Sequence, residues 1–166
     1  GLDYIKYDRR DGLRFGALTT IHAIETSPII KEKFSIFAQA ACSIGSAQVR
    51  NRGTVAGNIC SALPSADTAP ALLTLEARLT LVSQKAERTV NIEDFFTGPG
   101  KSVLTDEELL SEIQVPNLPP NSKGVYLKLT PRRAMDLAIV GVGVVVVQED
   151  GVCQDMRIAL GVVAPT

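Results

Sequence analysis

Apolar side chains recur every three or four residues in the first half of the chain, which is the spacing of one helix face. The positions of Ile29, Ile30, Phe34 and Phe37 predict a single helix over residues 28–42, with Pro28 at its start. One face of this helix should therefore lie in the core. Two shorter helices are also predicted, over residues 21–25, with Thr20 as the cap, and over residues 68–75.

Alternating apolar and polar residues between turn-forming pairs predict several β-hairpins. Asp-Gly pairs at positions 11–12 and 150–151 mark two of the turns. The predicted strands cover residues 4–6, 13–17, 78–82, 88–92, 109–115, 125–129, 138–148 and 152–163. Helices and hairpins together predict an α+β fold with a mixed or antiparallel sheet and flanking helices.

Composition narrows the class of protein only slightly. The 166 residues are 45% hydrophobic and 21% charged, so the chain can bury a core as one globular domain. A net charge of -1 gives no general attraction to nucleic acid, and no apolar run reaches the ~20 residues that a membrane-spanning helix needs. Three widely spaced cysteines argue against a disulfide framework, so we expect a cytoplasmic location.

The most informative stretch is residues 48–73, which is rich in small and turn-forming residues. Gly53 and Gly57 permit close approach of a ligand to the backbone, and Thr54, Asn58 and Ser61 carry short hydrogen-bonding side chains. Exposed amides in a turn of this kind can bind anions. The stretch also agrees with an ordinary connecting loop, in which case its last acidic residue, Asp67, is simply the N-cap of the helix at 68–75.

The amino-acid sequence of this stretch resembles that of a known cofactor-binding segment. Residues 50–58 read Arg-Asn-Arg-Gly-Thr-Val-Ala-Gly-Asn, and Pro64 and Asp67 follow before an apolar helix. This run resembles the FAD-binding segment of the molybdenum hydroxylase flavoproteins, the family of the xanthine dehydrogenase flavin domain and the carbon monoxide dehydrogenase medium subunit. The chain departs from the family at Ala56, where the family prefers glycine. A positive φ angle at this position would strain alanine, whereas a requirement for small size would not.

The resemblance implies an FAD-binding subdomain of the CO dehydrogenase flavoprotein or vanillyl-alcohol-oxidase-like type, with FAD as the cofactor. In the family, an apolar side chain at position 44 lies against the flavin ring, position 110 contacts FAD through its backbone, and a lysine at position 128 lies at the flavin. A lysine there can stabilise negative charge on the reduced ring. No catalytic or metal-binding residue is implied. The implied cofactor-binding residues are Ile44, Thr54, Gly57, Asn58, Ser61, Asp67, Leu110 and Lys128.

Two of these residues also have ordinary structural explanations. Ile44 can be a core isoleucine before a turn. Lys128 can be a solvated lysine on the predicted strand 125–129, where it shares one face with Tyr126 and Thr130. Residues 130–136 resemble a family loop that lies near the flavin and gates access of the electron acceptor. Within this loop, Asp136 is predicted to cap the chain or to pair with Arg132 or Arg133.

For the whole protein, the resemblance implies an oxidoreductase component that passes electrons from iron–sulfur clusters through FAD to an external acceptor such as NAD, quinone or oxygen. The implied partners are a large subunit with molybdopterin and a small subunit with 2Fe-2S clusters. We expect residues 1–166 to form a single, partial FAD-binding domain, truncated at both ends. We expect this domain to lack the N-terminal pyrophosphate-binding subdomain and the C-terminal flavoprotein subdomain, with residues 157–166 as the entry to the latter.

Two other functions agree with the same residues. The chain can serve only to dock partner subunits, without bound flavin. It can also be a flavin enzyme that oxidises its own substrate, although the sequence shows no clear catalytic base.

Overall fold

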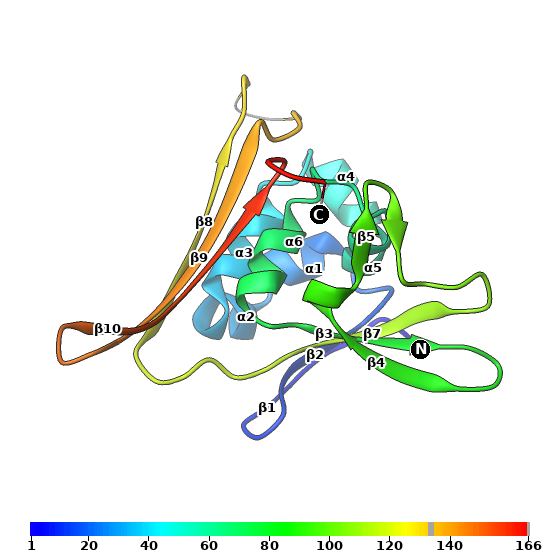
Figure 1. Ribbon diagram of the computed structural model, residues 1–166, viewed down its shortest axis with the longest axis horizontal. Helices are drawn as coiled ribbons and strands as arrows, with labels where there is room; N and C mark the ends of the chain where they lie inside the picture. The colour runs from blue at the N-terminus through cyan, green and yellow to red at the C-terminus, as the bar shows by residue number, and fades with distance from the viewer. Residues whose placement is uncertain (133–134, 166) are drawn as a thin grey trace.

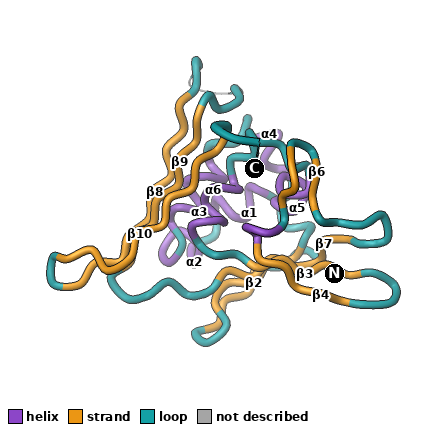
Figure 2. The backbone as a smooth tube through the Cα atoms, in the orientation of Figure 1, coloured by secondary structure: helices purple, strands orange, loops and turns teal. Residues whose placement is uncertain are grey.

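Two antiparallel sheets enclose a layer of short helices (Figures 1 and 2). The computed structural model describes residues 1–132 and 135–165. The six α-helices of this part of the chain are α1 (Ile21–Thr26), α2 (Pro28–Lys33), α3 (Ser35–Cys42), α4 (Ala47–Arg52), α5 (Val55–Cys60) and α6 (Thr68–Thr74). The architecture confirms the predicted α+β class, and the pairing of its sheets is antiparallel throughout the described residues.

The larger sheet contains two of the predicted hairpins and joins them through a central strand. Its order is β1-β2-β7-β3-β4. The strands are β1 (Ile5–Asp8), β2 (Gly12–Gly16), β7 (Leu109–Val115), β3 (Arg78–Val82) and β4 (Glu87–Asn91). Gly12 has a φ of +83°, so the tight turn between β1 and β2 uses the backbone freedom of glycine. A separate small ribbon of β5 (Phe96–Gly98) and β6 (Lys101–Ser102) follows β4 in the chain.

The predicted single helix over residues 28–42 is wrong, because the chain forms two helices that meet at Phe34. Phe34 has φ -134° and ψ 48°, which are not helical values, and its N–H bonds to Ile30 to close α2. Its ring is only 1% exposed and meets the Tyr7 ring edge-on at 6.2 Å. The break therefore buries a large aromatic side chain, and helical periodicity alone does not report such a bend because each half keeps its apolar face.

The smaller sheet packs one face on the helices and turns the other to solvent (Figure 1). Its order is β10-β9-β8, with strands β8 (Ser122–Leu129), β9 (Val140–Glu149) and β10 (Val152–Gly161). Gly124 and Gly143 lie on the inner face, where a Cβ would come within 3.0 Å of Ile36 and 2.9 Å of the Pro70 carbonyl. These glycines let α3 and α6 approach the sheet closely.

The outer face of the smaller sheet is apolar. Leu127 is 64% exposed on β8 and Ile158 is 59% exposed on β10. Apolar side chains therefore occupy both faces of this sheet, and the described residues cover only the inner face.

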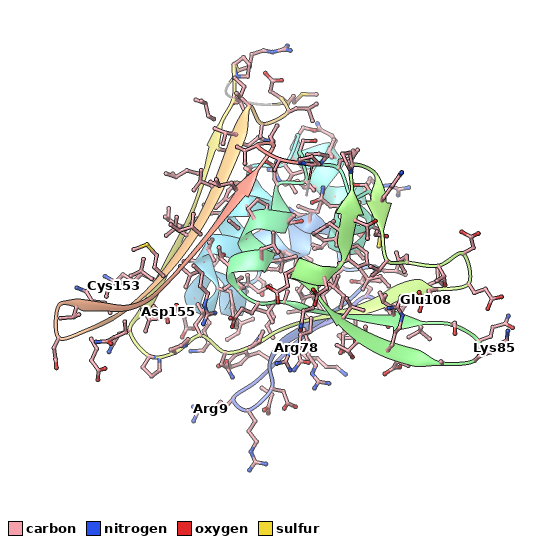
Figure 3. The ribbon with its side chains drawn as sticks, in the orientation of Figure 1. Arg9, Arg78, Lys85, Glu108, Cys153 and Asp155 are labelled. Atoms are coloured by element: carbon pink, nitrogen blue, oxygen red, sulfur yellow. The ribbon has the colours of Figure 1, made fainter. Side chains whose placement is uncertain are left out.

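A salt bridge fixes the loop before β7 to the hairpin β3–β4. Arg88 donates two hydrogen bonds to Glu108, at 2.6 and 2.8 Å, and the Thr105 amide donates a third. Figure 3 shows Glu108 and Lys85 at this end of the larger sheet. The hydrogen bonds from Arg88, followed by the one from Thr105, lower the pKa of Glu108 to about 2.

This shift predicts acid-dependent loosening of the loop. Because the pKa in the folded state lies below the ordinary 4.5, the stabilisation is complete above pH 4.5 and is lost as the pH falls toward 2. Arg88→Met should return the pKa of Glu108 toward its ordinary range in an NMR titration of the carboxyl group. Lys85→Met removes a neighbouring charge without touching these bonds, so it should leave the titration unchanged. An ordinary Glu108 pKa in the unmodified protein would contradict the assignment.

Among the described residues, no helix is both long enough and apolar enough to cross a membrane.

Candidate functional site

The glycine-rich stretch is folded differently from the predicted open turn. It forms α4 and α5, and Thr54 caps α5 by accepting a hydrogen bond from the Gly57 amide at 3.1 Å. The Val55 amide bonds to the Thr19 carbonyl. The expectation of successive free amides is therefore wrong. A threonine N-cap followed by small residues is compatible with a short helix, and a six-residue helix is too brief to show periodicity in the sequence.

Ala56 stands where the family motif prefers glycine. It lies inside α5 with a helical backbone and is 6% exposed. This position needs a small side chain rather than a positive φ angle. Alanine meets that need without strain.

A cavity of about 350 Å³ opens beside α5 and the segment that leads into α6. Four of the predicted site residues line it: Ile44, Asn58, Ser61 and Asp67. Val49 and Leu137 add apolar wall, and Asp136 adds a second carboxylate. The volume is within the usual range of ~300–1,000 Å³ for small-molecule sites.

A larger hollow of about 810 Å³ lies between the β3–β4 hairpin and the loop before β7. None of its described lining residues is buried. The smaller cavity is the better candidate because a buried polar group, Asp67, forms part of its wall.

Asp67 is the centre of a buried polar cluster. Its Oδ2 accepts a hydrogen bond from Lys128 Nζ at 2.8 Å, and both side chains are 9% exposed. Its Oδ1 accepts a hydrogen bond from the Tyr126 hydroxyl at 2.9 Å. Burial, followed by the neighbouring Asp67 charge, raises the pKa of Tyr126 above its ordinary range, so the hydroxyl keeps its proton.

These contacts test two structural alternatives from the sequence analysis, namely Asp67 as a simple helix cap and Lys128 as a solvated strand lysine. Within the described residues, the Asp67 side chain makes no capping hydrogen bond to α6, although it occupies the N-cap position. Lys128 also donates to the Ser43 carbonyl at 3.2 Å. Asp67 is therefore more than a helix cap, and Lys128 is not a solvated strand lysine.

The remaining polar wall offers both donors and acceptors. Asn58 Oδ1 accepts a hydrogen bond from the Thr68 hydroxyl, and its amide NH₂ group has no partner among the described residues. Ser61 donates to the Asn58 carbonyl at 2.7 Å and keeps its acceptor lone pairs. Ile44 is 9% exposed and lines the cavity as well as the core.

Other predicted site residues lie outside the cavity wall. Leu110 is 6% exposed in β7, opposite Leu81 in the core. Thr54 and Gly57 lie at the start of α5, just before Asn58 in the same helix. The cofactor-binding roles of these three residues stay predictions.

Sequence reasoning did not select three residues that the site uses: Val49, Tyr126 and Leu137. The strand alternation placed Tyr126 on the same face as Lys128, and this was the available signal for it. Leu137 follows the loop at residues 130–136, in which Arg132 Nε lies 3.4 Å from Asp136 Oδ2. The predicted alternative pairing with Arg133 lies outside the described residues.

Arg50 anchors the loop that carries Ile44. Its Nε donates to Glu25 at 2.7 Å, and its Nη1 donates to the Ile44 carbonyl at 3.0 Å. Burial acts to raise the pKa of Glu25, but hydrogen bonds from Arg50, Cys42 and His22 outweigh it and lower the pKa.

Arg50→Met should therefore loosen the cavity wall. The half-buried Glu25 carboxylate loses its Arg50 donor and keeps Cys42 and His22, and the Ile44 carbonyl loses its donor as well, which should lower the free energy of unfolding by ~1–3 kcal/mol. Urea denaturation measures this loss, and hydrogen exchange should speed up at residues 43–46. Arg52→Met is the matched control in the same helix, because Arg52 is exposed. Equal effects of the two substitutions would contradict the anchoring role.

Comparisons with known proteins agree with this arrangement. The sequence profile of the FAD binding domain in molybdopterin dehydrogenase matches residues 1–118, and that of the CO dehydrogenase flavoprotein C-terminal domain matches residues 125–166. Asp67 belongs to the first region, whereas Tyr126 and Lys128 belong to the second. The buried cluster therefore joins the two matched regions.

Individual relatives give the same result. The chain is 36% identical over 155 residues to the xanthine dehydrogenase FAD-binding subunit of Escherichia coli O157:H7, covering 93% of this chain and 53% of that protein. It is 36% identical over 160 residues to the glyceraldehyde dehydrogenase medium chain of Sulfolobus acidocaldarius, covering 96% and 56%. The chain thus spans about half the length of the curated relatives that it matches.

A solved structure agrees closely with the fold. The carbon monoxide dehydrogenase of Hydrogenophaga pseudoflava superimposes with a TM-score of 0.94 at 33% identity, covering 99% of this chain and 57% of that chain. Three observations lead to one assignment: the fold, the sequence motif at residues 50–58 and the profile match over residues 1–118. This chain belongs to the family of FAD-binding domains of the molybdopterin dehydrogenases, as its sequence resemblance predicted.

Proposed function

We propose that this chain holds FAD in the cavity beside Asp67 and serves as the electron-transfer component of a molybdenum-containing hydroxylase or dehydrogenase. The observation that carries the proposal is the buried Asp67–Lys128 pair, whose carboxylate lines a cavity with both apolar and polar walls. Buried charges are rare unless they are paired, and their concentration at a cavity is typical of functional sites.

The residues present fit the cofactor of the family. A flavin ring has broad apolar faces and an edge that carries both N–H donors and carbonyl acceptors. Ile44, Val49 and Leu137 supply apolar contact, Asp67 can accept from an N–H group, and the free Asn58 amide can donate to an oxygen. Lys128 lies behind the cavity wall and neutralises the Asp67 carboxylate, which allows this acceptor to stay charged although it is buried.

The electron route follows from the chemistry of the cofactor and the names of the relatives. Bound FAD can accept electrons singly from iron–sulfur clusters and release them as a pair to NAD, quinone or oxygen. Relatives are named as a medium chain and as an FAD-binding subunit, and another solved structure that this chain resembles is a Cu,Mo-CO dehydrogenase. We infer a molybdopterin-binding large subunit and an iron–sulfur small subunit as partners. Free thiols at Cys42, Cys60 and Cys153 support a cytoplasmic location for this assembly.

The flavin content of the purified assembly that contains this chain tests the proposal. We expect the visible absorption bands of oxidised flavin and about one FAD per chain after denaturation and chromatography. A folded, colourless assembly would overturn the proposal and favour the alternative of a docking module without flavin.

A further inference from the structure

Tyr126 is the third member of the buried cluster at Asp67. It lies on the inner face of β8 and is 6% exposed. Its hydroxyl donates to Asp67 Oδ1 at 2.9 Å, and its backbone N–H donates to Gln39 Oε1 at 2.9 Å. Both ends of the residue are therefore held, one by α3 and the other by the carboxylate before α6.

The two oxygens of Asp67 have different donors. Lys128 holds Oδ2 at 2.8 Å, whereas the tyrosine holds Oδ1. A carboxylate with one donor on each oxygen cannot turn about its Cβ–Cγ bond without breaking a hydrogen bond. Among the described residues of this cluster, Asp67 is the one that lines the cavity. The orientation of its free lone pairs therefore depends on the two residues behind it.

Gly141 leaves room for the Tyr126 hydroxyl. A Cβ added at Gly141, on the neighbouring strand β9, would lie 2.7 Å from Tyr126 Oη but 3.5 Å from Cζ. The first distance is a clash and the second is ordinary contact. Glycine at this position therefore accommodates the hydroxyl oxygen in particular, and the phenyl ring would tolerate alanine.

We propose that Tyr126 is a positioning residue of the flavin site, whose hydroxyl fixes the Asp67 carboxylate in the orientation that accepts a hydrogen bond from a ring N–H of FAD. This inference rests on the proposed function of the cavity. The hydroxyl stays protonated across the working pH range, because burial and the Asp67 charge raise its pKa. It is therefore a permanent donor, and Asp67 can offer its remaining lone pairs to a ligand.

The test compares Tyr126→Phe with Tyr4→Phe. Tyr4 also donates to a carboxylate, Glu112, at 2.6 Å, but it does so at the larger sheet and away from the cavity. FAD is titrated into the flavin-stripped assembly, and the dissociation constant, visible spectrum and reduction potential of the flavin are measured. Tyr126→Phe should weaken FAD binding about tenfold or more and shift the spectrum and potential. Tyr4→Phe should change none of the three.

Gly141→Ala is a second test of the role of Tyr126. It displaces the hydroxyl without removing it, so it should also weaken FAD binding and shift the flavin spectrum. In the Tyr126→Phe background the clash is gone, so adding Gly141→Ala should cost little further stability or affinity. This suppression is a readout that general weakening of the sheet would not produce.

The outcomes separate the two proposals. If the unmodified assembly binds no FAD, the proposed function fails and this inference fails with it. If the unmodified assembly binds FAD and both tyrosine variants behave alike, Tyr126 has only a structural role and this inference alone is overturned. If Tyr126→Phe does not fold, Gly141→Ala decides: a folded variant with unchanged FAD binding and spectrum overturns the inference, and weakened binding supports it.

Discussion

Replacing Asp67 with alanine should lower the free energy of unfolding by ~3–5 kcal/mol, because it leaves the buried Lys128 ammonium without its partner. The side chains of both residues are 9% exposed, so water cannot replace the lost carboxylate easily. The same substitution should abolish FAD retention, since the cavity loses its buried acceptor. Guanidinium denaturation measures the first effect, and the FAD content of the purified assembly measures the second.

A double variant separates these two effects. Asp67→Ala combined with Lys128→Met replaces both charges with apolar side chains, which commonly restores much of the lost stability of a buried ion pair. We expect stability to recover while FAD binding stays lost. A small loss in the single variant, below ~1 kcal/mol, would show that the pair is exposed to solvent in solution. Recovery of FAD binding in the double variant would contradict the role of Asp67 as an acceptor.

Gly143→Ala should have the next largest effect, because the added Cβ would lie 2.9 Å from the Pro70 carbonyl oxygen. Neither β9 nor the first turn of α6 can yield locally, since both contacting groups are backbone. Overpacking of this kind costs ~1–3 kcal/mol. Because α6 begins beside Asp67, separating it from the sheet should also lengthen the Asp67–Lys128 contact and weaken FAD binding.

Thermal denaturation followed by FAD titration measures both consequences. Gly98→Ala is the matched control, because the nearest described atom to its added Cβ lies 4.0 Å away, at the flexible end of Lys101. It should leave the melting temperature and FAD affinity nearly unchanged. A Gly143→Ala variant as stable as the control would mean that the helix and the sheet are not packed as closely as the structure has them.

The sequence predicts most strands correctly because each hairpin carries its own turn signal. Asp150-Gly151 forms the turn between β9 and β10 as predicted, Gly12 begins β2 one residue before the predicted start, and β7 covers the predicted residues 109–115. The helices are predicted less well. Phe34 has a non-helical backbone inside a continuous helical pattern, and α5 begins at a capping threonine inside a stretch with the composition of a loop. Both features depend on contacts with distant parts of the chain.

The site shows a similar limit. Asp67 and Lys128 are 61 positions apart, and alternation along β8 indicates only that Tyr126 and Lys128 share a face. Their meeting with Asp67 depends on how the smaller sheet packs against α6, which small residues such as Gly143 permit. The resemblance to the family motif pointed to Asp67 and Lys128 before their contact was known. It did not identify Tyr126, whose role follows only from the hydrogen bond at Asp67 Oδ1.

The central claim is that the wall formed by Asp67 and its buried partners faces the flavin. The most direct test is an experimental structure of the FAD-loaded assembly that contains this chain. The account predicts an Asp67 carboxylate oxygen within about 3 Å of a ring N–H nitrogen of the cofactor, with Lys128 and Tyr126 still bonded behind it. A flavin ring bound elsewhere, with the cavity beside Asp67 filled only by water, would contradict it.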